Sequence, residues 1–275
     1  MTSHNESQPQ DSRVQRRLRR LKNSIRKRIP WGHAKGRESF LETARNKIIV
    51  PVTGRIRFHG NLFDLRHPRM IDGIQQALEK GTYEWREIAM IDRHVRQDDR
   101  VVELGACLGA TSMFLYDRVG KDGLVVFEAD PRNLEMARHN FKLNRKNVHC
   151  ENAILWSGPN RPDTVSFGSN ENPSSSSLLD REGNEVTFEI QTKDFETALA
   201  EHQATVIVLD IEGGEIDLFN NAGDLSGIRV IIMEAHERVV GEEANEAMLD
   251  GLKARKFEIS ENLSNKYIVL TRAQP

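Results

Sequence analysis

The sequence has few cysteines and lacks any long apolar run. Its 275 residues include two cysteines, Cys107 and Cys150, and neither belongs to a C-x-x-C pair or lies near a second metal ligand. We therefore expect reduced thiols and no zinc site. No stretch approaches the roughly 18 uninterrupted apolar residues of a membrane-spanning helix, and no apolar signal-peptide core follows the first basic residues. These absences predict a cytoplasmic protein.

Charge is distributed unevenly along the chain. The net charge is −2, but residues 1–30 contain nine Lys or Arg against two acidic residues, so the remainder is acidic. An acidic core argues against nucleic acid as its partner, because a duplex is a dense array of phosphates. The length fits one large domain with an N-terminal extension, since single cores stop growing at roughly 250 to 300 residues.

The N-terminal extension, residues 1–30, contains a predicted basic helix. Residues 1–12 are polar and have no apolar period, so we expect a disordered tail. In residues 13–29 apolar side chains recur at spacings of three and four, which predicts an amphipathic helix. Such a helix suits peripheral contact with an anionic membrane at its inner surface, or contact with nucleic acid. A solvated helix docked on the domain or on a partner fits equally well.

Residues 31–84 read as a linker followed by an N-terminal cap, ahead of a catalytic domain over residues 85–275. Lys47–Val52 and Arg55–Phe63 are strand candidates, and Arg69–Glu79 has helical periodicity. A second helical pattern runs from Tyr83 to Val95. We expect this mixture of helices and strands to cover one end of the core.

Beyond residue 95 the pattern predicts a doubly wound, Rossmann-like α/β fold. Short apolar runs alternate with helical stretches, which is typical of a mostly parallel sheet buried on both faces. The interval Ser157–Phe195 departs from this pattern, and we expect a hairpin-like insertion there. Lys256–Ser260 and Tyr267–Leu270 predict a closing antiparallel C-terminal hairpin. The predicted parallel strands are Arg100–Leu104, Leu124–Glu128, Val148–Asn152, Val206–Ile211 and Val230–Glu234.

The first of these strands runs into a glycine turn. Gly105 and Gly109 remove side-chain bulk at the carboxyl end of the strand, where an open α/β sheet binds its ligand. A dinucleotide-binding fold needs a glycine at the second position of its G-x-G-x-x-G motif, where this chain has Cys107. Glu103 is poorly placed for a phosphate and well placed for an ammonium group. The turn therefore favours an adenosyl cofactor without phosphates, although two glycines also occur where packing is merely tight.

Further cofactor contacts are predicted at the next two strand ends. Glu128 ends the second strand, about twenty residues after the glycines, where a carboxylate accepts hydrogen bonds from both hydroxyls of a ribose. Asn152 and Ala153 follow the third strand, where the edge of an adenine is expected. An Asn at a strand end is equally often a turn former, so that contact stays open.

These residues resemble the FkbM family of S-adenosylmethionine-dependent methyltransferases. The resemblance implies a class I methyltransferase sheet, S-adenosyl-L-methionine as cofactor, and O-methylation of hydroxyls on sugars, glycolipids or polyketides. It adds Tyr83, Ala106 and Ala129 to the expected cofactor contacts. The chain departs from the family at Glu103 and Cys107, where Asp and Asn are usual. The matching segments are Gly81–Glu84, Glu103–Gly109, Phe127–Pro131, Asn133, Asn140, Asp210–Glu215 and Glu234–His236.

Acidic residues and a histidine follow the fourth and fifth strands, where the methyl group should lie. Methyl transfer to a hydroxyl needs a base, and we predict His236 for that role, with Asp210 orienting the acceptor or acting as base, and Glu234 beside them. Asp210 also counts among the expected cofactor contacts. A divalent cation held by these carboxylates is possible but not favoured, because their spacing matches no known motif. Glu212 and Glu215 fit a simple role at a helix start.

Three functions compete on the sequence alone. The preferred one is O-methylation of a carbohydrate, glycolipid or other small molecule. The second is an RNA or DNA methyltransferase, which is disfavoured because the chain has no N-P-P-Y-like tetrapeptide and no Pro-Cys nucleophile. The third is a non-catalytic cofactor-binding module. The sequence determines neither the acceptor nor the oligomeric state.

Overall fold

The structure is a computed structural model that describes residues 34–169, 172–173 and 186–273. The chain divides into two units, residues 1–41 and residues 42–275. The tail and basic helix predicted within residues 1–30 lie outside the described residues. Helix α2 (Ala34–Thr53) is the first described element, and no helix in the described part of the chain has the length and apolar character needed to cross a membrane.

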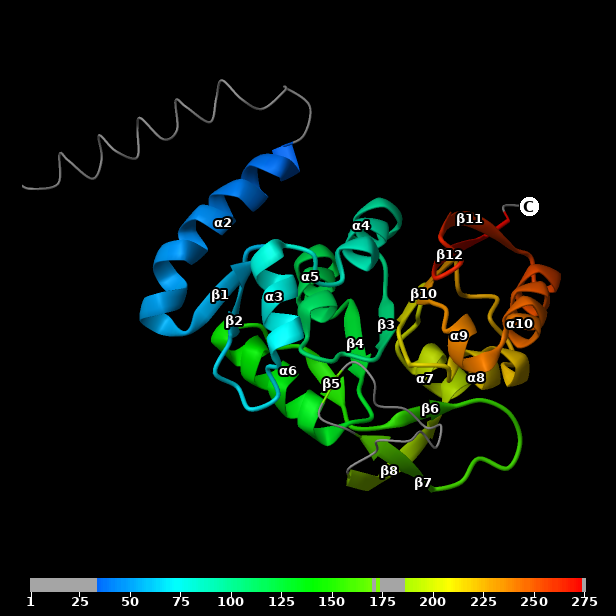
Figure 1. Cartoon of the computed structure of the whole chain (residues 1–275). Helices are drawn as coiled ribbons and strands as arrows, with labels where there is room; N and C mark the ends of the chain where they lie inside the picture. The colour runs from blue at the N-terminus through cyan, green and yellow to red at the C-terminus, as the bar shows by residue number, and fades with distance from the viewer. Residues whose placement is uncertain (1–33, 170–171, 174–185, 274–275) are drawn as a thin grey trace, which may run out of the picture. The chain divides into compact units, whose positions relative to one another are not determined.

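The second unit is built on a central sheet that confirms the predicted α/β fold (Figure 1). Across the described residues the strand order is β11-β12-β10-β9-β3-β4-β5. β5, β4, β3, β9 and β10 run parallel, while β12 pairs antiparallel with β10 and with β11, so the closing hairpin is also confirmed. The bounds are β3 (Val101–Leu104), β4 (Leu124–Phe127), β5 (His149–Glu151), β9 (Val206–Leu209), β10 (Val230–Glu234), β11 (Phe257–Leu263) and β12 (Tyr267–Arg272).

The sheet is buried on both faces, which explains why its strands are uninterrupted apolar runs. Successive side chains alternate between two cores: Val101 points to one face and Val102 to the other. The first core is completed by α3 (Asp72–Lys80), α4 (Trp85–His94), α5 (Ala110–Val119) and α6 (Pro131–Leu143). The second is completed by α7 (Phe195–Glu201), α8 (Glu215–Asn221) and α10 (Glu242–Ala254), with the short α9 (Glu237–Val240) ahead of α10.

The predicted strand Lys47–Val52 is wrong, because these residues continue helix α2. Their β-branched side chains favour a strand, but a tertiary contact overrides that preference. The Asn46 side chain donates to the Arg57 carbonyl and accepts from the Arg57 amide, at 2.7 and 2.8 Å. The side chain of Asn46 in the helix thus satisfies both backbone hydrogen-bonding groups of Arg57 at the edge of the next strand.

The predicted strand Arg55–Phe63 is instead a hairpin of two strands. β1 (Arg55–Phe58) and β2 (Asn61–Asp64) pair antiparallel across the turn at His59 and Gly60. The hairpin-like insertion within residues 157–195 is confirmed: β7 (Thr164–Ser169) pairs antiparallel with β8 (Val186–Asp194). β6 (Ile154–Trp156) adds in parallel to β8, so these strands form a small sheet of their own.

The β1–β2 hairpin is fixed to the core by two asparagines, Asn140 in α6 and Asn144 directly after that helix. The side chain of Asn144 accepts from the Leu62 amide and donates to the Leu62 carbonyl, both at 2.7 Å. The fully buried Asn140 accepts from the Asp64 amide of β2 at 3.4 Å and donates to the Leu108 carbonyl at 3.0 Å. These bonds satisfy backbone groups that would otherwise lose water without gaining a partner.

Replacing Asn144 with Ala is expected to lower the free energy of unfolding by roughly 1–3 kcal/mol, because both backbone groups of Leu62 lose their partner. Urea unfolding of the two proteins measures the difference. The matched control is Asn147→Ala, whose exposed side chain makes no hydrogen bond in the described structure; it should stay within about 0.5 kcal/mol of the wild type. Equal destabilisation by both substitutions would contradict the assignment.

Candidate active site

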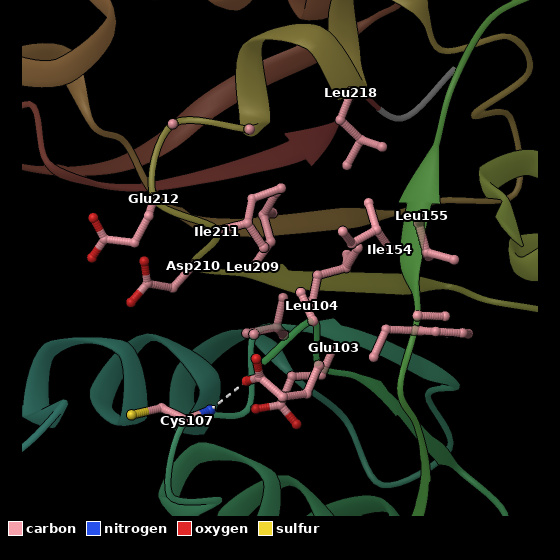
Figure 2. Close-up of a pocket in the computed structure, with 18 of the residues that line it drawn as sticks. Glu103, Leu104, Cys107, Ile154, Leu155, Leu209, Asp210, Ile211, Glu212 and Leu218 are labelled. Carbon is pink, nitrogen blue, oxygen red and sulfur yellow. Dashed lines mark hydrogen bonds between the residues drawn. The ribbon is translucent and has the colours of Figure 1, made fainter. Parts of the chain in front are cut away.

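A cavity of about 390 Å³ opens at the carboxyl ends of β3, β4 and β9. Apolar side chains gather on one side of it, and Asp210 and Glu212 direct their carboxylates away from that side (Figure 2). The small sheet supplies part of the apolar wall. The apolar wall includes Leu104, Phe127, Ile154, Leu155, Phe167, Leu209, Ile211 and Leu218.

The glycine turn after β3 is held against the backbone of the loop after β9. Gly105 has a φ of +89°, and a Cβ at this position would lie 2.1 Å from the Asp210 carbonyl oxygen. Gly105 lines the cavity, and its contact with the cofactor stays a prediction. Gly109 precedes α5 with a φ of +80°, and a Cβ there would lie 2.5 Å from the Phe141 ring. Gly109 is not among the lining residues, so its cofactor contact stays a prediction.

Glu103, on β3, is a buried carboxylate without a hydrogen bond. Its side chain lines the cavity, only 1% of the residue is exposed, and neither carboxylate oxygen has a hydrogen-bond partner in the described structure. Burial raises the pKa of Glu103 well above its usual value, and the neighbouring Ser112 hydroxyl lowers it only in part. A charged carboxylate here needs a cation, and the ammonium group expected from the sequence is one that fits.

Glu128, after β4, joins the glycine turn to the neighbouring strand end. Its Oε2 accepts from the amides of Ala106 and Cys107 at 2.8 and 2.9 Å, and its Oε1 accepts from the Asp130 amide at 2.8 Å. Burial raises the pKa of Glu128 to about 7 despite these bonds. A carboxylate has about four lone-pair directions, so Glu128 can also accept bonds from ribose hydroxyls.

The remaining predicted cofactor contacts divide into two groups. Ala129 and Ala153 line the cavity, so they lie where a cofactor contact is predicted. The Asn152 side chain instead donates to the carbonyls of Glu128 and Ala129, both at 2.8 Å, and therefore holds the turn. Tyr83 is not among the lining residues. Its hydroxyl donates to the sulfur of Cys107, which does line the cavity, at 3.3 Å.

Acidic residues of the α4 region line the cavity and were missed by the sequence reasoning. Glu87 is 6% exposed, and burial raises the pKa of both Glu84 and Glu87. The Thr111 hydroxyl donates to Glu84 at 2.5 Å. Glu84 belongs to the segment that matches the family, so a signal for it existed; nothing in the local pattern marks Glu87 or Thr111.

The predicted catalytic residues come together at the end of the cavity lined by Asp210 and Glu212, which we call the mouth. His236 Nε2 lies 3.4 Å from Asp210 Oδ1, 3.7 Å from Glu212 Oε1 and 3.5 Å from Glu234 Oε1. Asp210 and Glu212 line the cavity, whereas His236 and Glu234 lie behind them. Burial raises the pKa of Asp210 well above its usual value, and the nearby Glu234 adds to this.

The environment of His236 favours its protonated form. Burial lowers its pKa, but the hydrogen bond to Glu215 and the surrounding carboxylates outweigh burial and raise the pKa of His236 to about 9. Its side chain is 8% exposed. The role of His236 as the base stays a prediction.

The donor set fits S-adenosyl-L-methionine. Glu103 offers an unpaired carboxylate for an ammonium group, Glu128 offers acceptors for ribose hydroxyls, and the apolar wall suits an adenine. Gly105 leaves open the position that a side chain would fill. Seven acidic residues and no basic residue line the described cavity, which favours a ligand that carries positive charge; they are Glu84, Glu87, Glu103, Glu128, Asp210, Glu212 and Asp217.

Comparison with known proteins identifies the family of the chain. The family model for the methyltransferase FkbM domain matches residues 103–259. Among curated proteins, none matches the chain significantly. Similar solved structures include Aeropyrum pernix fibrillarin with natively bound S-adenosyl-L-methionine, at 12% identity over 66% of this chain and 71% of that one, with a TM-score of 0.37. Another is the ribosomal protein L11 methylase of Lactobacillus delbrueckii subsp. bulgaricus. It has 13% identity over 70% of this chain and 80% of that one, with a TM-score of 0.40.

The sheet order and the family match together define an S-adenosylmethionine-dependent methyltransferase. The chain belongs to the FkbM methyltransferase family, because the family model matches more than half of its length.

Replacing Gly105 with Ala is expected to weaken binding of S-adenosylmethionine at least about tenfold and to destabilise the fold by about 2 kcal/mol or more, because the φ is strained for alanine and its Cβ meets backbone. Calorimetric titration and thermal unfolding measure the two effects. The matched control is Gly73→Ala in α3, where an added Cβ meets nothing within 4 Å. A Gly105→Ala protein with wild-type affinity would refute the role of the turn.

Affinity for S-adenosylmethionine is expected to fall as the pH is lowered from 8 to 6. Glu128, with a pKa of about 7, loses its charge over this interval, and a single group that must be ionised gives about a tenfold decrease. Titrations at several pH values measure this slope. Glu128→Gln should bind more weakly and with a flatter dependence on pH. An unchanged slope in that variant would exclude Glu128 as its source.

Proposed function

We propose that the protein transfers the methyl group of S-adenosylmethionine to a hydroxyl of a carbohydrate, a glycolipid or another small molecule. The observation that carries the proposal is the unpaired, buried carboxylate of Glu103 in a cavity that it shares with Glu128 and Gly105. An acidic group without a partner is costly in such a place unless a cationic ligand binds it.

The chain's own residues divide the work between two ends of the cavity. When bound, S-adenosylmethionine supplies a methyl group on a positively charged sulfur, and transfer to a hydroxyl leaves S-adenosylhomocysteine and a proton. Glu103 and Glu128 hold the ammonium and the ribose at one end, and the apolar wall excludes water there. Asp210 and Glu212 face the other end, where the acceptor enters.

Asp210 is the group best placed to take the proton. Its side chain is 35% exposed, and its Oδ1 is shielded from solvent. Its raised pKa makes it a stronger base than an ordinary aspartate. His236 lies behind Asp210 and is therefore a positioning residue in this proposal.

The acidic mouth supports a neutral hydroxyl acceptor over nucleic acid. A polynucleotide would bring its phosphates towards Asp210 and Glu212, and like charges repel. Carboxylates are good hydrogen-bond acceptors for the hydroxyls of a sugar. Membrane contact through residues 13–29 would bring the enzyme to a lipid-linked glycan, and that contact stays a prediction.

Incubation of the protein with S-adenosylmethionine labelled in its methyl group and with fractionated cell extract is expected to label a glycan or small-molecule fraction. The label should resist alkali, because a methyl ether is stable where a methyl ester is hydrolysed. Label that RNase or protease releases would overturn the proposed acceptor class.

Asp210→Asn should lower kcat at least about a hundredfold in the same assay, since the group that takes the proton is lost. Its affinity for S-adenosylhomocysteine should change little, because the contacts of Glu103 and Glu128 remain. The exposed Asp163, remote in sequence from these strand ends, provides the control Asp163→Asn, which should retain wild-type kcat.

A further inference from the structure

The cluster behind the mouth has the arrangement of a metal site. Three carboxylate oxygens, from Asp210, Glu212 and Glu234, surround one nitrogen of His236 at 3.4, 3.7 and 3.5 Å. That nitrogen, Nε2, is buried and makes no hydrogen bond in the described structure, and the same is true of Asp210 Oδ1. The potential donor atoms of Asp210, Glu212 and His236 all lie within 4.8 Å of one another.

The orientation of His236 is fixed from behind. Its Nδ1 lies 3.1 Å from Glu215 Oε1, and the Glu215 side chain is 2% exposed. Glu215 also accepts from the Ile211 amide at 3.1 Å, so its own position is set by the backbone. Without an ion, the surrounding carboxylates favour a proton on Nε2 as well. A bound ion would take the place of that proton, while Nδ1 keeps its own proton towards Glu215. Histidine ligands of metals almost always have such a partner on the other ring nitrogen.

The spacing and the chemistry of the donors select the kind of ion. Ligands held at about 2.0–2.2 Å from one ion lie about 3.0–3.6 Å apart, and the three distances fall close to that range. Imidazole together with carboxylate suits first-row transition ions, whereas Ca²⁺ and Mg²⁺ prefer oxygen donors alone. Lys266 neutralises only part of the charge, because its ammonium contacts Glu234 and no other member of the cluster.

We infer that Asp210, Glu212 and His236 bind a divalent first-row transition ion such as Mn²⁺, with Glu234 as a further ligand and Glu215 as the partner that orients His236. The inference rests on the proposed function, since the ion would bind the acceptor hydroxyl and lower its pKa. Asp210 binds the ion through the shielded Oδ1. Its second carboxylate oxygen then accepts the proton, which a hydroxyl bound to the ion gives up more readily than a free one.

The test is Mn²⁺ binding to the full-length protein after removal of metals with a chelator. Electron paramagnetic resonance measures free Mn²⁺, and we expect one bound ion per chain. Pulsed measurements on the wild type should detect coupling to the ¹⁴N of an imidazole. Binding without nitrogen coupling, or no binding at tenth-millimolar Mn²⁺, would overturn the inference without any substitution that threatens folding.

Substitutions then locate the site. His236→Gln should abolish the nitrogen coupling, Glu212→Gln should weaken Mn²⁺ binding at least tenfold, and Glu215→Gln should weaken it by about 10- to 100-fold. The control is His149→Gln, since the His149 side chain is 57% exposed and belongs to β5; it should bind Mn²⁺ as the wild type does. Retained coupling in His236→Gln would place the ion elsewhere and refute the site.

Failure of this inference is distinguishable from failure of the proposed function. Calorimetry on the metal-free protein measures S-adenosylmethionine binding through Glu103 and Glu128, which the ion does not touch. If the cofactor binds and methyl transfer proceeds at full rate without any ion, the metal site is wrong and the function stands. If added Mn²⁺ raises turnover of the metal-free enzyme at least about tenfold, and His236→Gln loses that increase, both are supported.

Discussion

The structure depends on a cluster of carboxylates, most of them buried, around the cavity at the carboxyl end of the central sheet. Burial raises the pKa of Glu84, Glu87, Glu103 and Asp210, and no basic side chain lines the described cavity to offset their charge. A fold tolerates such a cluster only at a cost in stability, unless a cation relieves it. The sulfonium and ammonium of S-adenosylmethionine are positive charges of the kind that this cavity favours.

Backbone contacts connect the two ends of the cavity. The Gly105 amide donates to the Phe127 carbonyl, and the Asp210 amide donates to the Leu104 carbonyl. A side chain at position 105 would collide with the Asp210 carbonyl. The turn that admits the cofactor is therefore in contact with the residue that faces the acceptor. The positions of these residues along the sheet therefore set the separation between the cofactor end and the acceptor end of the cavity.

Much of this arrangement was predictable from the sequence, because the central strands are buried on both faces and their apolar runs are unambiguous. Glu103 and Glu128 followed from their places at strand ends. The helix over Lys47–Val52 was not predictable, since it depends on the contact of Asn46 with β1. Glu87 escaped for the same reason: only packing of α4 against the sheet brings its carboxylate to the cavity, and local periodicity does not record that packing.

Three residues of the cavity wall have a strained backbone, and the contacts of their side chains hold that backbone in place. Glu84, Cys107 and Glu212 have φ angles of 44°, 47° and 56°, in the left-handed region that favours glycine. Each such residue costs on the order of 1 kcal/mol or more, and surrounding contacts must hold it in place. Thr111 bonds to Glu84 and Tyr83 bonds to Cys107, while Glu212 faces His236. Glycine at these positions would remove the strain, but it would also remove these contacts. The side-chain contacts of the cavity wall therefore offset the cost of its strained backbone.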